Sequence, residues 1–493
     1  MKPVEKVDVL ISGGIVITMD GQERIIPNGA VAVRGSRIHL VGAVDEVEKV
    51  VVPEITVDAS GMVILPGLVN AHTHAAMTLF RGLADDIPLK PWLEKIWPLE
   101  LKYATAGNVV LGSELAFGEM ISGGTTTAAD MYWHFYEAAE AAKRVGFRLF
   151  TGVVALDAID GETSESRENS MRAFIDRYKE DPLITPCVEV HGIYTVSKDT
   201  LLIAKRVAHE KEVVFVTHAS ETQQEVAGSV EQHGVTPVRY LEQVGLLNSA
   251  TLLAHGVYLD DEEIQLLERR GTSVVHCPSS NLKLGSGIAR VADMLKAGVN
   301  VAIGTDGVAS NNDLDMWEEM RLAALLQKGI HLDPTVLPAK QVLKMATLGG
   351  ARALNLENEI GSLEPGKRAD LIVVNLNSLN LTPMYDVVSH LVYAANAHDV
   401  WMTMIDGKIV YRDGELLTID EEKIKTAMRA LSAKMAQGQW IKRVCQSRTL
   451  FQKWASKYRP AKLYGPEFVS KVKRKSLKRI SVSLREWLRL IRG

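Results

Sequence analysis

The sequence predicts an α/β fold in which eight strands, with helices between them, form a TIM barrel, and both ends of the chain build a smaller β domain. Three observations lead to this prediction. Eight apolar, β-prone runs recur between residues 62 and 303 and alternate with helical patterns. Short β runs separated by turn residues fill residues 4–60 and return beyond residue 361. A chain of 493 residues, 46% of them hydrophobic, can bury one large core and also carry accessory parts.

The β domain is predicted from two separate segments, residues 1–61 and 361–418. In the first, runs such as Val7-Asp8-Val9-Leu10-Ile11 are bounded by glycine and aspartate turn signals. In the second, Asp406-Gly407 lies between two apolar runs, which is a strong hairpin signal. Neither segment is long enough to make a full sandwich. We therefore expect the two segments to pair into one β-sandwich domain.

The barrel is assigned to residues 62–360. Helical patterns, for example 138–145, 200–209 and 261–270, lie between most strands and imply a parallel sheet with right-handed crossovers. Eight such units over about 290 residues match a TIM barrel in number and size. A doubly wound open sheet is the competing layout, but polar residues here end nearly every strand instead of gathering at one switch point. The expected strands are 62–71, 125–131, 147–156, 184–190, 213–217, 251–254, 273–275 and 299–303.

Two histidines separated by one residue follow the first strand, in Asn70-Ala71-His72-Thr73-His74. In an extended backbone residues i and i+2 point to the same side, so both imidazoles can face one metal ion. Such pairs also occur by chance on solvated strands. Taken alone, the pair leaves a metal site and a chance pattern equally open.

Polar residues also end the other strands, and in a barrel the carboxyl ends of all strands meet at one face. Each residue alone has a structural explanation, because a lone histidine commonly satisfies local hydrogen bonds and an Asp-Gly pair commonly makes a turn. Their joint occurrence is hard to explain by packing and predicts a functional site at that face. The residues are His72, His74, His191, His218, Glu221, His255, His276 and Asp306.

Six motifs occur in order over roughly residues 5–415. They are PGLVNAHTH at 66–74, HASE at 218–221, AHG at 254–256, CPSSNLKLG at 277–285, GTDG at 304–307 and GSLEPGKRADL at 361–371. Through them the chain resembles the adenosine deaminase-like branch of the amidohydrolase superfamily. The resemblance implies a distorted TIM barrel with a two-part β domain, in agreement with the layout above.

The resemblance also implies a metal centre. His72, His74, His218 and Asp306 would bind one zinc ion per subunit and leave an open position for water. Related binuclear hydrolases use a lysine on the fourth strand, carbamylated to bridge two metals. The corresponding segment, residues 186–191, has no lysine, which favours a single metal.

The implied reaction is the hydrolytic deamination of adenosine-type nucleosides to inosine analogues and ammonia. In the family, the match of Glu221 carries a proton from the attacking water to the purine ring nitrogen. The matches of His255 and Asp306 orient and deprotonate that water. The implied substrates are 5'-methylthioadenosine, S-adenosylhomocysteine, 5'-deoxyadenosine and adenosine, with Glu221 and Asp306 also in contact with the base.

Further substrate contacts are implied at five positions. Glu100 matches a glutamate that accepts hydrogen bonds from the ribose hydroxyls, and His191 matches a histidine that contacts the nucleoside. Trp92 falls where the family packs an aromatic ring on the ligand, although an ordinary core contact explains it nearly as well. Arg148 and Arg167 match only approximately the arginines that reach the amino-acid carboxylate of adenosylhomocysteine. The choice among 5' substituents therefore stays open.

Two alternative functions remain. A guanine deaminase or a triazine-type aminohydrolase of the same branch would share the metal ligands and differ in the substrate pocket. A metal-free scaffold protein would be a different class, but it would require lost ligands, and all four are present in the sequence.

The remaining residues, 419–493, are predicted to form a helical extension that is basic from residue 440. The segment 440–493 holds 16 lysine and arginine residues against two glutamates, so it carries +14 and the preceding residues carry −18. Residues 480–491 form a basic amphipathic pattern that could contact an anionic membrane surface. Docking on the acidic body or on a neighbouring subunit is the alternative that we favour, and nucleic acid is not expected.

The cellular location is predicted from cysteine usage and the amino terminus. Only three cysteines occur, far apart in the sequence, which suits a reducing compartment. Neither a signal peptide nor a membrane span is apparent at the charged amino terminus. We therefore expect a cytoplasmic protein, and we expect it to be a homo-oligomer.

Overall fold

The computed structural model describes residues 5–157 and 163–436. Its contacts divide the chain into one unit of residues 1–428 and another of residues 429–493. In the second unit the described residues, 429–436, are helical. The predicted basic segment from residue 440 lies outside the described residues.

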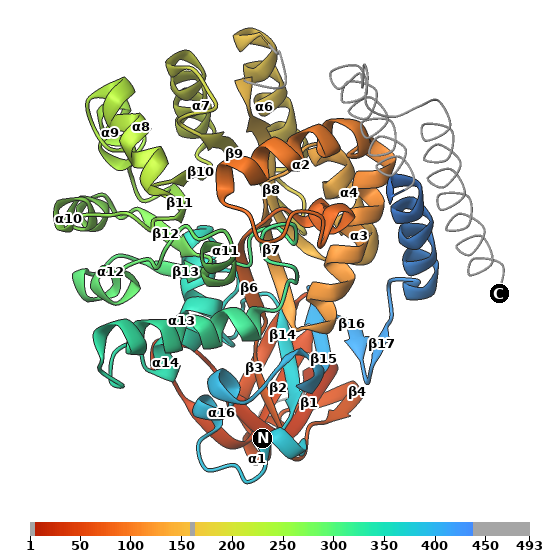
Figure 1. The fold of residues 1–493 in the computed structure, drawn as a ribbon. Helices are drawn as coiled ribbons and strands as arrows, with labels where there is room; N and C mark the ends of the chain where they lie inside the picture. The colour runs from red at the N-terminus through yellow and green to blue at the C-terminus, as the bar shows by residue number, and fades with distance from the viewer. Residues whose placement is uncertain (1–4, 158–162, 437–493) are drawn as a thin grey trace, which may run out of the picture. The chain divides into compact units, whose positions relative to one another are not determined.

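Eight parallel strands form the barrel in the first unit, and each strand pairs with the next one along the chain. Figure 1 shows the helices fanned around the outside of these strands. The predicted (β/α)8 barrel is therefore confirmed. Its strands are β6 (Leu68–Thr73), β7 (Thr125–Asp130), β8 (Arg148–Ala155), β9 (Ile184–Gly192), β10 (Phe215–Ala219), β11 (Thr251–His255), β12 (Ser273–His276) and β13 (Val301–Ile303).

Several of the helices that cover the barrel begin at ordinary capping residues. Thr105, Ser197 and Thr222 each accept a backbone N–H in the first turn of their helix, and Asp260 forms a reciprocal capping box with Glu263. The main helices are α2 (Leu89–Tyr103), α3 (Ala106–Ser122), α4 (Phe135–Val145), α6 (Ser164–Tyr178), α7 (Lys198–Lys211), α8 (Gln223–His233), α9 (Pro237–Val244), α10 (Asp261–Arg270), α11 (Pro278–Lys283), α12 (Val291–Ala297), α13 (Met316–His331), α14 (Ala339–Lys344), α15 (Gly350–Ala353) and α16 (Val387–Tyr393).

The barrel closes between β6 and β13, the two strands at the ends of the hydrogen-bonded order. The carboxamide of Asn70 spans this seam, because its Nδ2 donates to Oγ1 of Thr305 at 2.7 Å and its Oδ1 accepts the Thr305 N–H at 3.0 Å. The N–H of Asp306 donates to the carbonyl of His72 at 3.0 Å. These hydrogen bonds therefore join the two edges of the barrel next to the predicted metal ligands His72 and Asp306.

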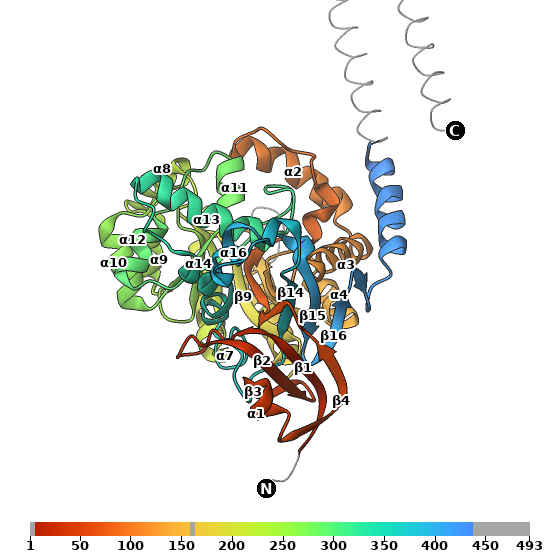
Figure 2. The ribbon, with the colours of Figure 1, turned by 90° about the horizontal axis from the view of Figure 1, so that it is seen from below.

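Both ends of the chain contribute to one nine-stranded sheet, as the sequence predicts. Figure 2 shows β1 to β4 beside β14 to β16, and buried residues from both segments form one core cluster. The strands are β1 (Glu5–Ile17), β2 (Ile25–Arg34), β3 (Arg37–Ala43), β4 (Val51–Asp58), β5 (Met62–Pro66), β14 (Leu371–Asn375), β15 (Val400–Ile405), β16 (Lys408–Arg412) and β17 (Glu415–Leu416). Short helices α1 (Val44–Val47) and η1 (Ala75–Phe80) complete the amino-terminal part.

The run 62–71, predicted as one barrel strand, is two strands that belong to different sheets. β5 pairs with β1 and β14, whereas β6 pairs with β7 in the barrel. Gly67 separates them, and a Cβ there would lie 2.1 Å from Oγ1 of Thr126. Only glycine permits this close approach, so the chain can cross from the sheet to the barrel within one residue. The sheet therefore extends beyond residue 61, whereas the other proposed domain boundaries stay predictions.

No helix among the described residues combines the length and the hydrophobic character needed to cross a membrane.

Candidate metal and active site

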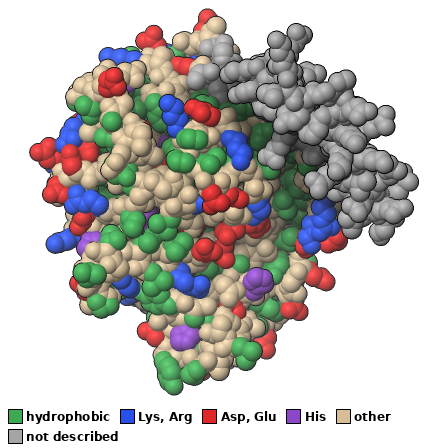
Figure 3. Space-filling view, viewed as in Figure 1, with side chains coloured by type: hydrophobic (Ala, Val, Ile, Leu, Met, Phe, Trp, Pro, Cys, Tyr) green, Lys and Arg blue, Asp and Glu red, His purple; other side chains and the backbone are tan. Residues whose placement is uncertain are grey.

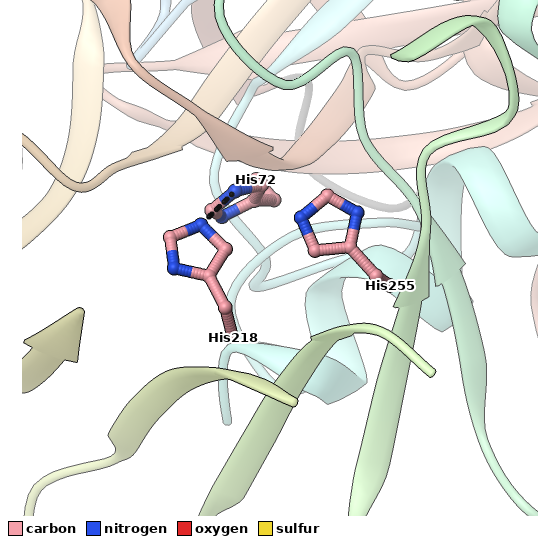
Figure 4. Close-up of side chains that lie close together, drawn as sticks. All are labelled: His72, His218 and His255. Carbon is pink, nitrogen blue, oxygen red and sulfur yellow. Dashed lines mark hydrogen bonds between the residues drawn. The ribbon is translucent and has the colours of Figure 1, made fainter. Parts of the chain in front are cut away.

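Three histidines and an aspartate meet at the carboxyl ends of β6 and β10 and in the turn after β13. Nε2 of His74 lies 3.2 Å and Nε2 of His72 lies 3.6 Å from Oδ1 of Asp306. Nε2 of His218 lies 3.1 Å from Nε2 of His72, as Figure 4 shows with the neighbouring His255. All four side chains are buried or nearly so. The structure thus brings together the four predicted ligands from three distant segments.

The donor atoms of this group fit a metal cation. His74 and His218 each place Nδ1 at 2.5 Å from a backbone carbonyl, of Met131 and His191 respectively. When neutral, both rings donate through Nδ1 and direct the lone pair of Nε2 into the site. Lone pairs that converge on the carboxylate of Asp306 require positive charge between them. The histidine and carboxylate set matches the ligands that zinc takes in hydrolytic sites.

The ionisation of the group reflects the same need for positive charge. Burial lowers the pKa of His74, but the hydrogen bond with Asp306 and its charge outweigh burial and raise that pKa to about 9. Burial would raise the pKa of Asp306, but His72 and His74 hold it well below its usual range. The protein therefore maintains a carboxylate at a buried position that a cation must neutralise.

Asp306 is fixed by further donors around its carboxylate. The hydroxyls of Ser280 and Ser310 donate to Oδ2 at 2.6 and 3.0 Å, and the N–H of Gly307 donates to Oδ1 at 2.7 Å. The backbone of Asp306 itself lies in the left-handed region, with φ of 59°. These contacts hold the carboxylate in one orientation toward the histidines.

Glu221 and His255 lie beside the ligand group. Oε2 of Glu221 is 3.9 Å from Nε2 of His255, and Oε1 accepts a hydrogen bond from the hydroxyl of Ser286 at 3.3 Å. Nδ1 of His255 lies 2.9 Å from Oδ1 of Asn281, which directs Nε2 toward His72 and Glu221. Burial raises the pKa of Glu221, so this side chain can hold a proton at a higher pH than an exposed glutamate.

A cleft that is open to solvent lies over these groups. Its lining combines aromatic rings, aliphatic side chains and the polar groups described above, an arrangement typical of small-molecule sites. The lining residues include Trp92, Trp97, Glu100, Tyr132, Trp133, Leu156, His191 and Tyr194.

The structure places three predicted substrate residues in this cleft. The buried Glu100 accepts a hydrogen bond from the hydroxyl of Tyr132 at 2.8 Å, and burial raises its pKa to about 7. Nε1 of Trp92 donates to the carbonyl of Ala309 at 3.0 Å, so this residue both lines the cleft and ties α2 to the segment after Asp306. The ring of His191 lies 4.9 Å from that of His218, between centroids.

The structure does not bring Arg148 to the cleft, and its assignment to the substrate side is corrected here. Arg148 begins β8, at the opposite end of the barrel from the ligands. Its guanidinium donates to both oxygens of Asp370, at 2.6 and 3.0 Å, and also to Asp406. It therefore links the barrel to the nine-stranded sheet. Arg167 is not among the lining residues either, and it pairs with Asp157 at 2.7 Å.

His276, which the sequence places at the same face, ends β12 but is not among the residues that line the cleft. Several residues that support the site could not be assigned from the sequence. Ser280 and Asn281 follow β12 and hold Asp306 and His255, a role that their place in the CPSSN motif could have suggested. Tyr132 follows β7 without any motif that marks it. Glu225 stands three residues after a helix-capping threonine, which predicts a capping contact but not its actual partners.

Comparisons with known proteins agree with this geometry. The model of the amidohydrolase family matches residues 63–410. A 5-methylthioadenosine/S-adenosylhomocysteine deaminase from Thermodesulfovibrio yellowstonii is 44% identical over 84% of this chain and 96% of its own. A 5'-deoxyadenosine deaminase from Methanosarcina acetivorans is 42% identical over 87% of this chain and 99% of its own. The crystal structure of an adenosine deaminase from Xanthomonas campestris with bound zinc superposes with a TM-score of 0.86 at 39% identity, covering 88% of this chain and 100% of that chain.

Proposed function

The chain belongs to the amidohydrolase family, and we propose that it is a hydrolase that deaminates adenosine-type nucleosides with the help of one zinc ion per subunit. The substrates that we propose are 5'-methylthioadenosine, S-adenosylhomocysteine, 5'-deoxyadenosine and adenosine, and the products are inosine analogues and ammonia. The single observation that carries the proposal is the convergence of three imidazoles and one carboxylate beside the buried Glu221. The names of the relatives above support the choice of substrate class.

The metal centre is assigned to His72, His74, His218 and Asp306. A divalent metal suits this donor set, and zinc is the finer proposal, supported by the zinc-bound adenosine deaminase of similar fold. When bound, such a metal lowers the pKa of water toward neutrality and so supplies hydroxide near pH 7. The absence of a lysine in residues 186–191 supports a single metal.

The chemistry of the chain's own residues is proton transfer. Deamination replaces the exocyclic amine at C6 of the purine with the oxygen of water, so one proton must reach the ring nitrogen and another the leaving amine. Glu221 is suited to carry these protons because it is buried and holds a proton readily. His255, held by Asn281, would orient the attacking water, and Asp306 would accept its proton.

The substrate side of the site is assigned to the cleft residues. Glu100 would accept hydrogen bonds from the ribose hydroxyls, His191 would contact the nucleoside, and Trp92 would lie against it. Glu221 and Asp306 would also contact the base. Glu100 favours a ribosylated purine over the free base guanine or a triazine, because neither of these offers a pair of vicinal hydroxyls. A metal-free scaffold is disfavoured because all four ligands are present and converge.

A spectrophotometric screen tests the proposal. The purified zinc-loaded protein is incubated with 5'-methylthioadenosine, S-adenosylhomocysteine, 5'-deoxyadenosine, adenosine, guanine and an aminotriazine, and the change of the ring chromophore is followed. We expect turnover of at least one adenosine nucleoside. Turnover of guanine or the triazine alone would replace the proposal with the corresponding alternative, and no turnover of any compound would favour the scaffold.

The partners beyond the substrate remain proposals from the sequence. We propose that the protein is a homo-oligomer, that it is located in the cytoplasm, and that its basic tail contacts a neighbouring subunit or a membrane surface. On the face in Figure 3, acidic and basic side chains of the described residues are interspersed. Liposome flotation with and without residues 440–493 tests the membrane contact.

A further inference from the structure

The turn that carries Glu221 is held by a second carboxylate, that of Glu225. Oε1 of Glu225 accepts the N–H of Ser220 at 3.0 Å, and Oε2 accepts the N–H of Glu221 at 2.7 Å. Glu225 is the third residue of α8, whose cap is Thr222. In an ordinary capping box this side chain would bind the N–H of the cap itself. Here it reaches past the cap to the two residues that follow β10.

This turn needs support because its backbone is unusual. Ser220 has φ of 55°, in the left-handed region that non-glycine residues rarely adopt. Its carbonyl accepts the N–H of Tyr258, and the carbonyl of Ala219 accepts the N–H of Gly256. The carbonyls of the turn are thus bound to the segment after β11, and the N–H groups of Ser220 and Glu221 are bound to Glu225. Both sides of the strained peptide are fixed.

The turn determines where the proton-carrying side chain points. Glu221 lies three residues beyond His218, and its carboxylate approaches His255 at 3.9 Å. Its own side-chain support is one hydrogen bond of 3.3 Å, from Ser286. A side chain with so few hydrogen bonds takes its direction largely from its backbone. The two shorter bonds to Glu225 are therefore the stronger constraint on its position.

We infer that Glu225 is a positioning residue for the reaction, which holds the backbone of Ser220 and Glu221 so that the Glu221 carboxylate faces the substrate. Glu225 is not itself among the residues that line the cleft, and it acts through its bond to the backbone N–H of Glu221, which is. The inference rests on the proposed function for its catalytic consequence. The contact itself is independent of any substrate.

The test compares Glu225→Ala and Glu225→Gln with Thr222→Ala. The glutamine keeps one acceptor oxygen, so its loss of activity should be the smaller. Thr222→Ala removes the cap of the same helix, because its Oγ1 accepts the N–H of Glu225 at 3.1 Å, but it leaves both held N–H groups in place. It is therefore the control for a mere weakening of α8.

We expect kcat for 5'-methylthioadenosine to fall about 10- to 100-fold in Glu225→Ala, with KM changed less than about threefold and one zinc retained per chain. Thr222→Ala should keep kcat within about twofold. Hydrogen exchange followed by mass spectrometry supplies a readout without substrate. Exchange in the peptide 218–224 should accelerate in Glu225→Ala and not in the control.

Three results would overturn the inference: unchanged exchange in this peptide, equal kcat in Glu225→Ala and Thr222→Ala, or loss of zinc together with activity. If Glu225→Ala does not fold, kcat and hydrogen exchange are compared between Glu225→Gln and Thr222→Ala instead. A wild-type protein that turns over no adenosine nucleoside would refute the proposed function, whereas the exchange result would still decide whether Glu225 holds this turn.

Discussion

Arg148 donates two hydrogen bonds to the carboxylate of Asp370, at 2.6 and 3.0 Å, from the first residue of β8 to the residue that precedes β14. Both side chains are buried, and Asp406 lies 3.3 Å from the same guanidinium. A paired arginine of this kind joins the barrel to the nine-stranded sheet. It also explains why an arginine that resembled a substrate ligand in the sequence lies far from the cleft.

Replacing Arg148 with methionine should destabilise the protein by about 3–5 kcal/mol, because the buried carboxylate of Asp370 loses its ion-pair partner. Urea denaturation measures this loss. Arg144→Met is the control, since Arg144 pairs with Glu114 at the surface with 54% of its side chain exposed, and it should cost at most about 1 kcal/mol. The folded Arg148→Met protein should keep the KM of the wild type. A raised KM with unchanged stability would return Arg148 to the substrate side.

Removal of the metal should abolish deamination, and one equivalent of zinc should restore it. Dialysis against a chelator, followed by elemental analysis and titration with zinc, gives the stoichiometry. Zinc should also raise the thermal midpoint, because it binds only the folded arrangement of ligands. His218→Ala should fail to bind zinc at the same concentration. Full activity of the metal-depleted protein would contradict the ligand assignment.

Glu221→Gln should bind zinc normally while kcat falls about 10²- to 10⁴-fold, because the amide cannot carry a proton. Steady-state kinetics together with the zinc content of the purified variant measure both effects. Turnover within tenfold of the wild type would show that another group transfers the proton.

The KM for nucleosides should rise as the pH falls below about 7, the pKa to which burial raises Glu100. Above this pKa the carboxylate accepts charge-assisted hydrogen bonds from the ribose, and below it the neutral acid accepts them less well. Glu100→Gln should show a high KM without this dependence. In Tyr132→Phe the hydrogen bond that lowers the pKa of Glu100 is lost, so the inflection should move to higher pH. A pH-independent KM in the wild type would refute the role of Glu100.

Nucleosides with an uncharged 5' group should be preferred over S-adenosylhomocysteine. Among the described residues, no lysine or arginine lines the cleft. Three acidic residues line it: Glu100, Glu221 and Asp306. The amino-acid carboxylate would thus find no cationic side chain to pair with among these residues. We expect kcat/KM to be at least about tenfold higher for 5'-methylthioadenosine. Equal values for both nucleosides would contradict this prediction.

The sequence predicted the barrel strands well because buried parallel strands are continuous apolar runs that end in polar residues. It failed at residues 62–71, where one apolar run feeds two sheets. The hydrophobic pattern is the same on both sides of Gly67, and only the closeness of Thr126 requires the glycine. Such a crossing is a tertiary property that periodicity does not encode.

The metal ligands could be predicted because they stand at strand ends within recognisable motifs. The supporting residues could not, because their partners are distant in sequence. Glu225 carried a capping signal, but its bonds to Ser220 and Glu221 depend on how the chain turns after β10. Arg148 was misassigned although its place at the start of the predicted strand 147–156 already indicates the end of the barrel opposite the ligands.

Closure of the seam between β6 and β13 determines when the metal site can be completed. Asn70 and Thr305 are joined across it although 235 positions separate them in the chain, and the same closure brings Asp306 to His72 in β6 and to His74 just beyond it. During synthesis, most of the polypeptide must be made before Asp306, the last of the four ligands in the sequence, exists. The complete set of four ligands can therefore exist only after residue 306 has been made and the barrel has closed.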